Sequence, residues 1–433
     1  TAACTAEVSA FLGAAQPSHF TASGTTVNYS GPAEWSYRRM VLHYARLCAA
    51  AGGVDAFLIG SELRGLTSLR GIANSFPFVE GLGTLAAEVK AILPSTKVSY
   101  AADWSEYASY QADGNLYFHL DPLWASPNID FIGIDNYMPI ADWRDEDGHA
   151  DEAWGSTYNL DYLRANVAGG EGFDWYYDSP EGEAFQRREP ITDGAHDEPW
   201  VYRVKDLRNW WLNPHHNRIG GTRTPTSTAW APMSKPFRFT EYGCAAIDKG
   251  SNQPNRFLDT LSSESGLPRA STGRRDDIVQ MQYLRAVGTY WSATENNPIS
   301  PIYDAAMVDM DHAHAWAWDA RPFPTFPALS NLWGDTSAYS RGHWLNGRMT
   351  NQPLDVVVRE ICGRCGAAAL DTSALYGVVR GYAVDQIQSG RGSLQPLLMW
   401  YSAEVAERDG LLRFALRDGR ADRRAAAAAT PAR

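Results

Sequence analysis

Several short apolar runs of the chain end directly in acidic or polar residues. The runs are 54–60 (VDAFLIG, then Ser61-Glu62), 97–102 (KVSYAA, then Asp103-Trp104), 129–134 (IDFIGI, then Asp135-Asn136-Tyr137), 236–240 (PFRFT, then Glu241) and 313–318 (AHAWAW, then Asp319). Near-continuous apolarity is typical of strands that are covered on both faces, as in parallel sheets. We therefore expect a buried parallel sheet whose strands end in chemically useful groups.

Helical patterns separate some of these runs. They cover 35–51, which stops at Gly52-Gly53, then 78–93 and 275–291, the last with Asp276-Asp277 in its first turn and Ser271 or Thr272 as N-cap. Alternating helices and buried strands indicate a barrel or a doubly wound sheet. No glycine-rich phosphate loop opens any of these helices, which argues against a nucleotide site. We therefore predict an α/β protein with a (β/α)8 TIM-barrel-like domain, in which function lies at the strand ends.

The barrel is expected over residues 1–345, with a long insertion at 138–235. Because fewer than eight strands are clear and Glu62 comes early, we place the first strands either before Thr1 or in the weakly patterned sequence before Pro32. Helices at 353–365 and 392–406 and strands at 375–385 and 411–415 predict a small α+β module over 346–420. The segment 421–433 (ADRRAAAAATPAR) is expected to be a linker.

Composition excludes some partners. The net charge of −12 and the pI near 5.3 argue against nucleic acid, because phosphate requires a basic surface. No apolar run is long enough to cross a bilayer, so no membrane span is expected.

Tryptophan is frequent and gathers in the insertion. Of 16 tryptophans, the insertion holds Trp143, Trp154, Trp175, Trp200, Trp210, Trp211 and Trp230. Two interpretations stay open, because indole rings stack on sugars but also fill cores. The insertion is either a stacking surface for a ligand or a small core of its own.

Glu62 and Glu241 are the candidate catalytic pair. Glycoside hydrolysis needs one carboxyl group that gives a proton to the departing oxygen and a second that stays ionised to attack or stabilise the sugar. Two glutamates at the ends of different barrel strands meet that need. The alternative is that each forms a salt bridge, Glu62 with Arg64 and Glu241 with Arg238.

The strand ends "IGSEL" and "FTEYG" resemble those of retaining glycoside hydrolases with (β/α)8 barrels. The resemblance implies that Glu62 is the acid/base, that Glu241 is the nucleophile and that Tyr137 steadies Glu241. It also implies that Trp316 or Trp318 floors the sugar site. The strand-end residues Asp103, Trp104 and Asn136 are expected to contact substrate as well. Ser61 departs from the pattern, since many relatives carry Asn there to contact the sugar 2-hydroxyl.

A longer resemblance covers nearly the whole chain. "GGVDAFLIGSELRGLT", "FHLDPLWASPNIDFIGIDNYMPIADWRD", "SKPFRFTEYGCAAIDKGSNQPN" and "AHAWAWDARPFPTFP" are similar to the barrel-like domain of gene transfer agent and phage tail proteins, and "VVREICGRCG" opens a segment that resembles their hub-type modules. This implies a baseplate protein at the tip of a phage-like particle. It would be made in the cytoplasm, act at the recipient cell envelope, and have envelope glycan and other tail proteins as partners. A barrel without catalysis, serving structure or glycan binding, is the alternative.

Other motifs give weaker signals. Cys362 and Cys365 have C-x-x-C spacing but no second pair, so they are interpreted as half-buried thiols of a helix. His312 and His314 would share one face of a strand, but no further ligand completes a metal site. His215 and His216 are expected to be solvated loop residues. We therefore predict neither a metal nor a cofactor.

Overall fold

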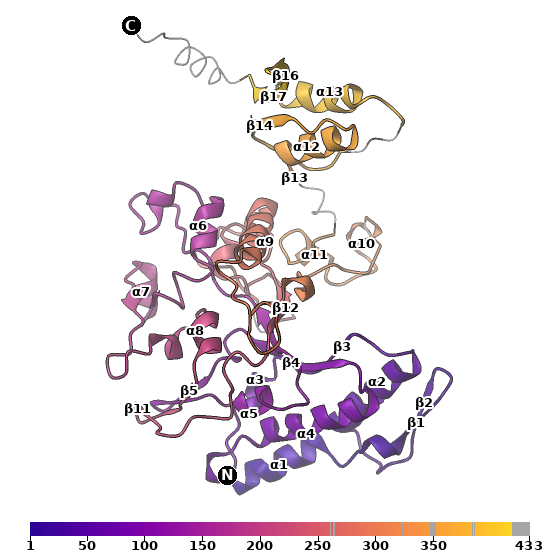
Figure 1. Cartoon of the computed structure of the whole chain (residues 1–433), viewed down its shortest axis with the longest axis vertical. Coiled ribbons are helices and arrows are strands. Elements are labelled where there is room, and N and C mark those ends of the chain that lie inside the picture. The colour runs from indigo at the N-terminus through magenta and orange to yellow at the C-terminus, as the bar shows by residue number, and fades with distance from the viewer. Residues whose placement is uncertain are drawn as a thin grey trace. The chain divides into compact units, whose positions relative to one another are not determined.

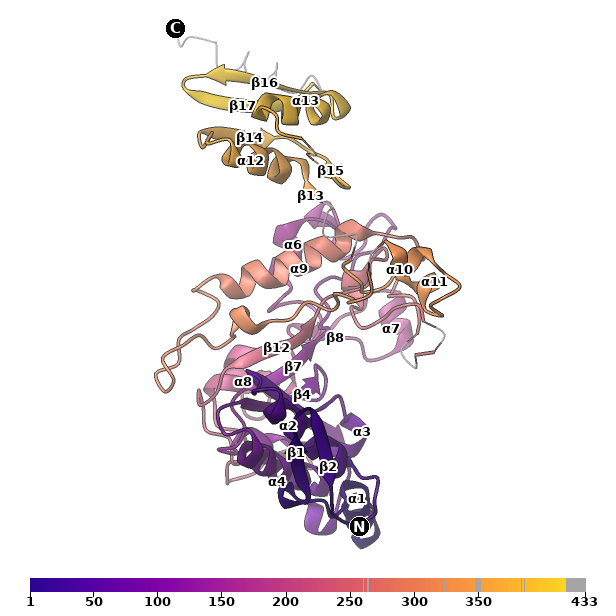
Figure 2. The same cartoon turned by 90° about the vertical axis from the view of Figure 1, so that its right-hand side faces the viewer.

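The computed structural model describes residues 1–259, 261–262, 265–322, 324–346, 352–382, 384 and 386–417 (Figures 1 and 2). The chain divides into two compact units. The first contains residues 1–317 and 335–343, and the second contains residues 318–334 and the described residues from 344 onward. The predicted linker 421–433 lies outside the described residues.

A four-stranded parallel sheet forms the centre of the first unit. Its strand order is β12-β7-β4-β3, with β3 Ala56–Ser61, β4 Lys97–Asp103, β7 Ile132–Asn136 and β12 Phe237–Tyr242. All neighbouring pairs are parallel, so the carboxyl ends of the strands meet at one edge. β7 is buried along its whole length. The parallel sheet predicted from the apolar runs is confirmed.

Helix α4 Pro77–Ile92 packs against β3 and β4, and α1 Ala2–Leu12 and α2 Tyr37–Ala50 pack against α4 (Figure 1). α4 buries Phe78, Leu82, Leu85 and Val89, a stripe with helical spacing. Ser36 caps α2 by accepting the N–H of Arg39. The ends of α2 and α4 agree with the predicted helices to within one or two residues.

The sequence before Pro32 does not supply barrel strands. After α1 it forms a hairpin of β1 Phe20–Ser23 and β2 Thr26–Tyr29, which are antiparallel to each other and make a two-stranded sheet. The expectation of early barrel strands in this segment is therefore wrong.

The prediction of a regular strand at 313–318 is also wrong, although the segment does lie beside β12. The chain from Met307 to Trp316 runs beside β12, where Val308 and Ala315 form isolated parallel bridges with Phe237 and Tyr242. Between the bridges lies the 3₁₀ helix η6 Met310–His312, which interrupts the pairing. His312 and His314 therefore do not share the face of a regular strand.

The insertion contains short elements with a core of their own. A sheet of order β11-β10-β6-β5 joins it to the chain after β4. In this sheet, β5 Tyr110–Ala112 and β6 Asn115–Tyr117 precede the insertion, and β10 Arg218–Ile219 and β11 Thr222–Arg223 belong to it. Further elements of the insertion are β8 Trp175–Tyr176, β9 Glu189–Pro190, α6 Leu160–Ala165, α7 Pro180–Ala184 and α8 Leu207–Leu212. Trp200, Trp210, Trp211 and Trp230 are buried, so the core interpretation holds for these four.

His215 is buried in that core, which corrects the expectation of a solvated loop histidine. Its ring stacks on Phe118 with centroids 4.3 Å apart. Nδ1 lies 2.9 Å from a carboxylate oxygen of Asp121, and Nε2 lies 2.7 Å from the carbonyl oxygen of Trp210. The burial follows because both ring nitrogens have partners inside the protein.

Helix α9 Asp277–Ser292 packs against α6, as Figure 2 shows. Its N-cap is Asp276, whose side chain accepts the N–H groups of Ile278 and Val279. The predicted caps Ser271 and Thr272 instead donate their hydroxyls to Asp248. The remaining short helices are α3 Arg64–Thr67, α5 Asp121–Trp124, α10 Thr325–Ala328 and α11 Thr336–Tyr339.

Besides α10, the described part of the second unit contains two longer helices and two small sheets. They are α12 Leu354–Arg364, α13 Gly390–Trp400, a sheet of order β14-β17-β16 (Leu370–Ala374, Leu411–Leu416, Ala403–Arg408) and a pair β13-β15 (Gln352–Pro353, Val378–Val379). The predicted strand 375–385 is reduced to β15, and Asp385 lies outside the described residues. The predicted helix 392–406 ends at Trp400, because β16 then pairs with β17. Cys362 is buried, Cys365 is exposed, and both are free thiols.

Within the described part of the chain, every helix is too short or too polar to span a bilayer.

Candidate active site

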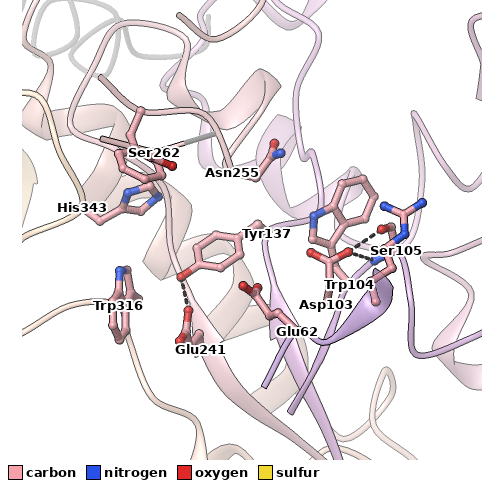
Figure 3. A pocket seen from close by; sticks show the side chains of 12 residues that line it. Glu62, Asp103, Trp104, Ser105, Tyr137, Glu241, Asn255, Ser262, Trp316 and His343 are labelled. Atoms are coloured by element: carbon pink, nitrogen blue, oxygen red, sulfur yellow. Dashed lines mark hydrogen bonds between the residues drawn. The ribbon is translucent and has the colours of Figure 1, made fainter. Parts of the chain in front are cut away.

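A pocket of about 540 Å³ lies at the edge where the parallel strands end (Figure 3). Of the residues predicted to form a site, Glu62, Asp103, Trp104, Tyr137, Glu241 and Trp316 line it. They come from the ends of β3, β4, β7 and β12 and from the segment beside β12. Side chains far apart in the sequence therefore share one pocket because the strands are parallel and neighbouring.

Glu241 is held by Tyr137. The hydroxyl of Tyr137 donates a hydrogen bond of 2.6 Å to Oε2 of Glu241 (Figure 3). Burial raises the pKa of Glu241, and the hydrogen bond from Tyr137 opposes that rise. A donor aimed at a carboxylate favours its ionised form and fixes its orientation. Arg238, which the alternative pairs with Glu241, instead contacts Asp309 at 3.0 Å.

Glu62 stands in a tight turn directly after β3. Its φ of 52° lies in the left-handed region, which is uncommon for a residue with a side chain. The N–H of Glu62 donates to the carbonyl oxygen of Ala101 at 2.9 Å, and the next N–H, of Leu63, donates to the hydroxyl of Tyr100 at 2.7 Å. These bonds to β4 hold a backbone conformation that directs the Glu62 side chain into the pocket (Figure 3).

A buried carboxyl group, Glu106, supports the turn that carries Asp103 and Trp104. It is 2% exposed and accepts hydrogen bonds from the hydroxyls of Thr67 and Tyr100 and from the N–H of Asp103. Burial raises the pKa of Glu106 to about 7. Since Tyr100 also accepts the N–H of Leu63, the two turns that bear Glu62 and Trp104 share one support.

Asp135 lies beneath the glutamate pair. It pairs in register with Asp103 on one side and with Glu241 on the other. Its carboxylate is 1% exposed and accepts from Thr240 Oγ1 at 2.6 Å and from Ser61 Oγ at 3.1 Å. Burial and then the charge of Glu241 raise the pKa of Asp135 to about 7.

Trp316 and His343 form the wall of the pocket next to Tyr137 (Figure 3). Trp316 is 47% exposed, and its backbone N–H donates to the carbonyl oxygen of Tyr242 at 2.9 Å, which holds its backbone to β12. The ring of His343 meets Tyr137 edge-on with centroids 5.5 Å apart, and its Nε2 lies 2.9 Å from the carbonyl oxygen of Pro254. An exposed indole beside a carboxylate is suited to stack on a sugar ring.

Two predicted residues do not line the pocket. The side chain of Asn136 is buried and turns back to accept the N–H of Met138 at 3.2 Å, so it is committed to the chain turn after β7. Trp318 belongs to the second unit and is not part of the lining. Of the two tryptophans proposed for the floor, Trp316 is therefore the one in the pocket.

Sequence reasoning missed several lining residues: Arg64, Ser105, Asn255, Phe257, Ser262 and His343. Most come from loops without a recognisable motif. Asp135 was visible as a strand-end acid and Glu106 follows the end of β4 by three residues, but no sequence signal says which acid is buried. Among the described residues, no group of three or more His, Cys, Asp or Glu side chains is arranged to hold a metal ion.

The fold and the strand-end site define an α/β protein of the TIM-barrel-like class. A family model described as the GTA TIM-barrel-like domain matches residues 35–327, and the chain belongs to this family. Among curated proteins no match was found.

Similar solved structures include two mannanases. One is the GH113 β-mannanase AaManA from Alicyclobacillus acidocaldarius in complex with ManMIm, at 14% identity and a TM-score of 0.32, covering 72% of this chain and 56% of that chain. The other is a GH113 β-1,4-mannanase, at 16% identity and a TM-score of 0.27, covering 60% and 48%. The chain thus spans about half the length of these proteins. Scores this low support neither a shared topology nor a shared activity.

Proposed function

We propose that the barrel-like domain is a retaining glycoside hydrolase that acts on cell-envelope polysaccharide. The observation that carries the proposal is the placement of Glu62 and Glu241 in one pocket at the strand ends, with Tyr137 donating to Glu241. Two carboxyl groups in different environments are the equipment that this reaction requires.

The roles are assigned from the resemblance of the strand ends, and the hydrogen bond from Tyr137 supports the role given to Glu241. Glu241, oriented by Tyr137, attacks the anomeric carbon, and Glu62 gives its proton to the departing glycosidic oxygen. Glu62 then takes a proton from water, which attacks the same carbon and releases Glu241. Trp316 and Trp104 offer apolar faces for the sugar rings that flank the bond.

The biological setting is a further part of the proposal. We infer that the TIM-barrel-like domain is part of a baseplate protein at the tip of a phage-like tail, with a hub-like module in the second unit. Such a protein has other tail proteins and the recipient envelope as partners. The resemblance of the motifs supports this setting, together with membership of the GTA TIM-barrel-like family.

One observation favours the alternative, a barrel that binds glycan without cleaving it. Ser61 stands beside Glu62, and its hydroxyl is used internally, because it donates to Asp135. The sugar 2-hydroxyl contact that hydrolases strengthen in the transition state would then need another donor.

The test compares wild type with Glu241→Gln and Glu62→Gln on purified cell-wall and capsular polysaccharides, with new reducing ends as the readout. Glu295→Gln is the matched control, since Glu295 is exposed and lies outside the pocket lining. Cleavage by wild type and the control, but not by the other two variants, is expected. Equal activity of Glu241→Gln, or no cleavage of any polysaccharide, would leave the binding alternative.

A further inference from the structure

A second hollow, of about 700 Å³, adjoins the candidate active site. Trp104 lines both, so the two hollows meet at this residue. A third hollow, of about 330 Å³, follows, and it shares Gln111 and Tyr202 with the second. The three hollows are therefore consecutive, and together they offer more room than a single sugar ring requires.

The second hollow is built mainly by the insertion and has an aromatic wall. Tyr176 on β8 lines it and is 47% exposed, and Tyr202 and Trp104 line it too. The backbone of Tyr176 pairs with Glu189 in the antiparallel β8-β9 ladder, which fixes its position. An exposed aromatic ring on a fixed backbone contributes stacking area at a low cost in conformational entropy.

The wall of this hollow is anchored to the barrel by a buried lysine. Lys205 is fully buried, and its Nζ donates at 2.6 Å to the carbonyl oxygens of both Pro139 and Gly169. Pro139 comes shortly after β7. Pro139, Glu171 and Gly172 all line the second hollow. The insertion and the strand end are thus tied together at the place where the second hollow begins.

The charges of the first pocket and the second hollow differ. Glu171 is held by Arg269 through contacts of 2.7 and 2.9 Å, and Asp193 is held by Arg218 at 3.3 Å, so the acids of the second hollow are neutralised. The first pocket has Glu62, Asp103 and Glu241 in its described lining, with Arg64 as its basic side chain. A ligand with carboxylate or phosphate groups would be repelled by that pocket.

We propose that the three hollows form one groove that binds a polysaccharide chain without acidic groups, with Tyr176 as a stacking platform beyond Trp104. The inference rests on the proposed function, because it makes the candidate active site one part of the groove. The substrate is then a polymer of uncharged or amino-bearing sugars, and the groove binds several consecutive units in the interior of the polymer.

Binding is tested in a Glu241→Gln background, which keeps the ligand intact. Three series, each from monosaccharide to hexasaccharide, are titrated calorimetrically: β-1,4-linked N-acetylglucosamine, β-1,4-linked glucosamine and a glucuronate-containing oligosaccharide. Affinity for a series without acidic groups should rise with chain length. Adding Tyr176→Ala should weaken hexasaccharide binding by about 5- to 30-fold, the usual cost of removing an aromatic anchor.

Phe185→Ala is the control, because Phe185 is an exposed aromatic residue of the same insertion outside the three hollows. It should leave binding unchanged, and thermal unfolding verifies that each variant is folded. The proposal is overturned if affinity does not depend on chain length, if Tyr176→Ala matches Phe185→Ala, if the acidic series binds as tightly, or if no series binds.

The two proposals fail separately. Length-dependent binding by a protein that cleaves no polysaccharide would support the proposed groove and contradict the proposed hydrolase activity. Cleavage with length-independent binding would do the reverse.

Discussion

Replacing Tyr137 with Phe isolates the hydrogen bond that distinguishes Glu241 from the other acids of the pocket. The substitution removes one hydroxyl, and with it the 2.6 Å donor to Oε2. The ring stays in place, because Tyr137 is 8% exposed and packs edge-on against His343. The change is therefore mainly electrostatic.

The direction of the effect follows from the causes of the pKa shift. Burial raises the pKa of Glu241 and the hydrogen bond from Tyr137 lowers it, so Tyr137→Phe raises this pKa further. A hydrogen bond to a charged group contributes about 1.5–3 kcal/mol, which corresponds to a loss of about 10- to 150-fold in ionised Glu241 at a pH below its pKa. At higher pH, Glu241 ionises in both proteins and the difference shrinks.

The assay is the pH profile of kcat/KM for wild type and Tyr137→Phe on the polysaccharide that wild type cleaves. The acidic limb should move to higher pH in the variant. A carbon-13 NMR titration of the glutamate carboxyl groups measures the same shift without turnover.

Tyr283→Phe is the control, because it removes a buried hydroxyl that donates to a neutral acceptor, the carbonyl oxygen of Met138, at 3.1 Å. It should leave the acidic limb in place. An acidic limb that is unchanged or moves to lower pH in Tyr137→Phe would refute the reasoning.

Further predictions concern the supports of the site. The pKa of Glu106 is raised from 4.5 to about 7, so its stabilising effect is present below about pH 4.5 and is lost as pH rises through about 7. The unfolding free energy should therefore fall by about 3 kcal/mol over this range. In Glu106→Gln, the unfolding free energy measured with urea should depend less on pH between about pH 5 and pH 8. An unchanged pH dependence would contradict this. Asp142, 1% exposed, contacts Arg144, Arg188 and Arg269 at 3.1, 3.0 and 3.2 Å. Asp142→Ala should cost about 3–5 kcal/mol in unfolding free energy, and a cost below about 1 kcal/mol would show that the cluster is solvated. In Gly243→Ala the added Cβ would lie 2.9 Å from the carbonyl oxygen of Trp316, so cleavage should fall by more than the loss of folded protein measured by circular dichroism, and unchanged cleavage would contradict this.

The parallel sheet was predictable because buried strands such as β4 and β7 are written as continuous apolar runs. The edge strand β3 has an apolar run as well, but it is not covered on both faces, since Leu58 is 41% exposed. The meeting of Glu62, Tyr137 and Glu241 in one pocket followed from the same pattern, since parallel neighbouring strands end at one edge. The irregular path beside β12 could not be predicted. The letters AHAWAW at 313–318 alternate as a strand does, but in the structure Ala315 forms an isolated bridge with Tyr242 and a 3₁₀ helix at Met310–His312 precedes it.

The supporting acids could not be predicted either. Asp135 and Asp103 both end apolar strands, and only their tertiary partners separate them. Asp135 is buried because Thr240 and Ser61 satisfy its oxygens, whereas Asp103 accepts hydrogen bonds from Ser105 in its own turn. Asn136 is a residue type that often contacts ligands, yet its side chain accepts a hydrogen bond from the backbone N–H of Met138 in the turn that follows.

The anomeric configuration of the first product tests the central claim most directly. Proton NMR of wild type acting on its polysaccharide, recorded before mutarotation, reports whether the new reducing end keeps the configuration of the cleaved bond. With Glu241 as nucleophile and Glu62 as acid/base, retention is predicted, and Glu241→Gln should give no product signal. An inverted first product, or a product signal of equal size from Glu241→Gln, would contradict the account.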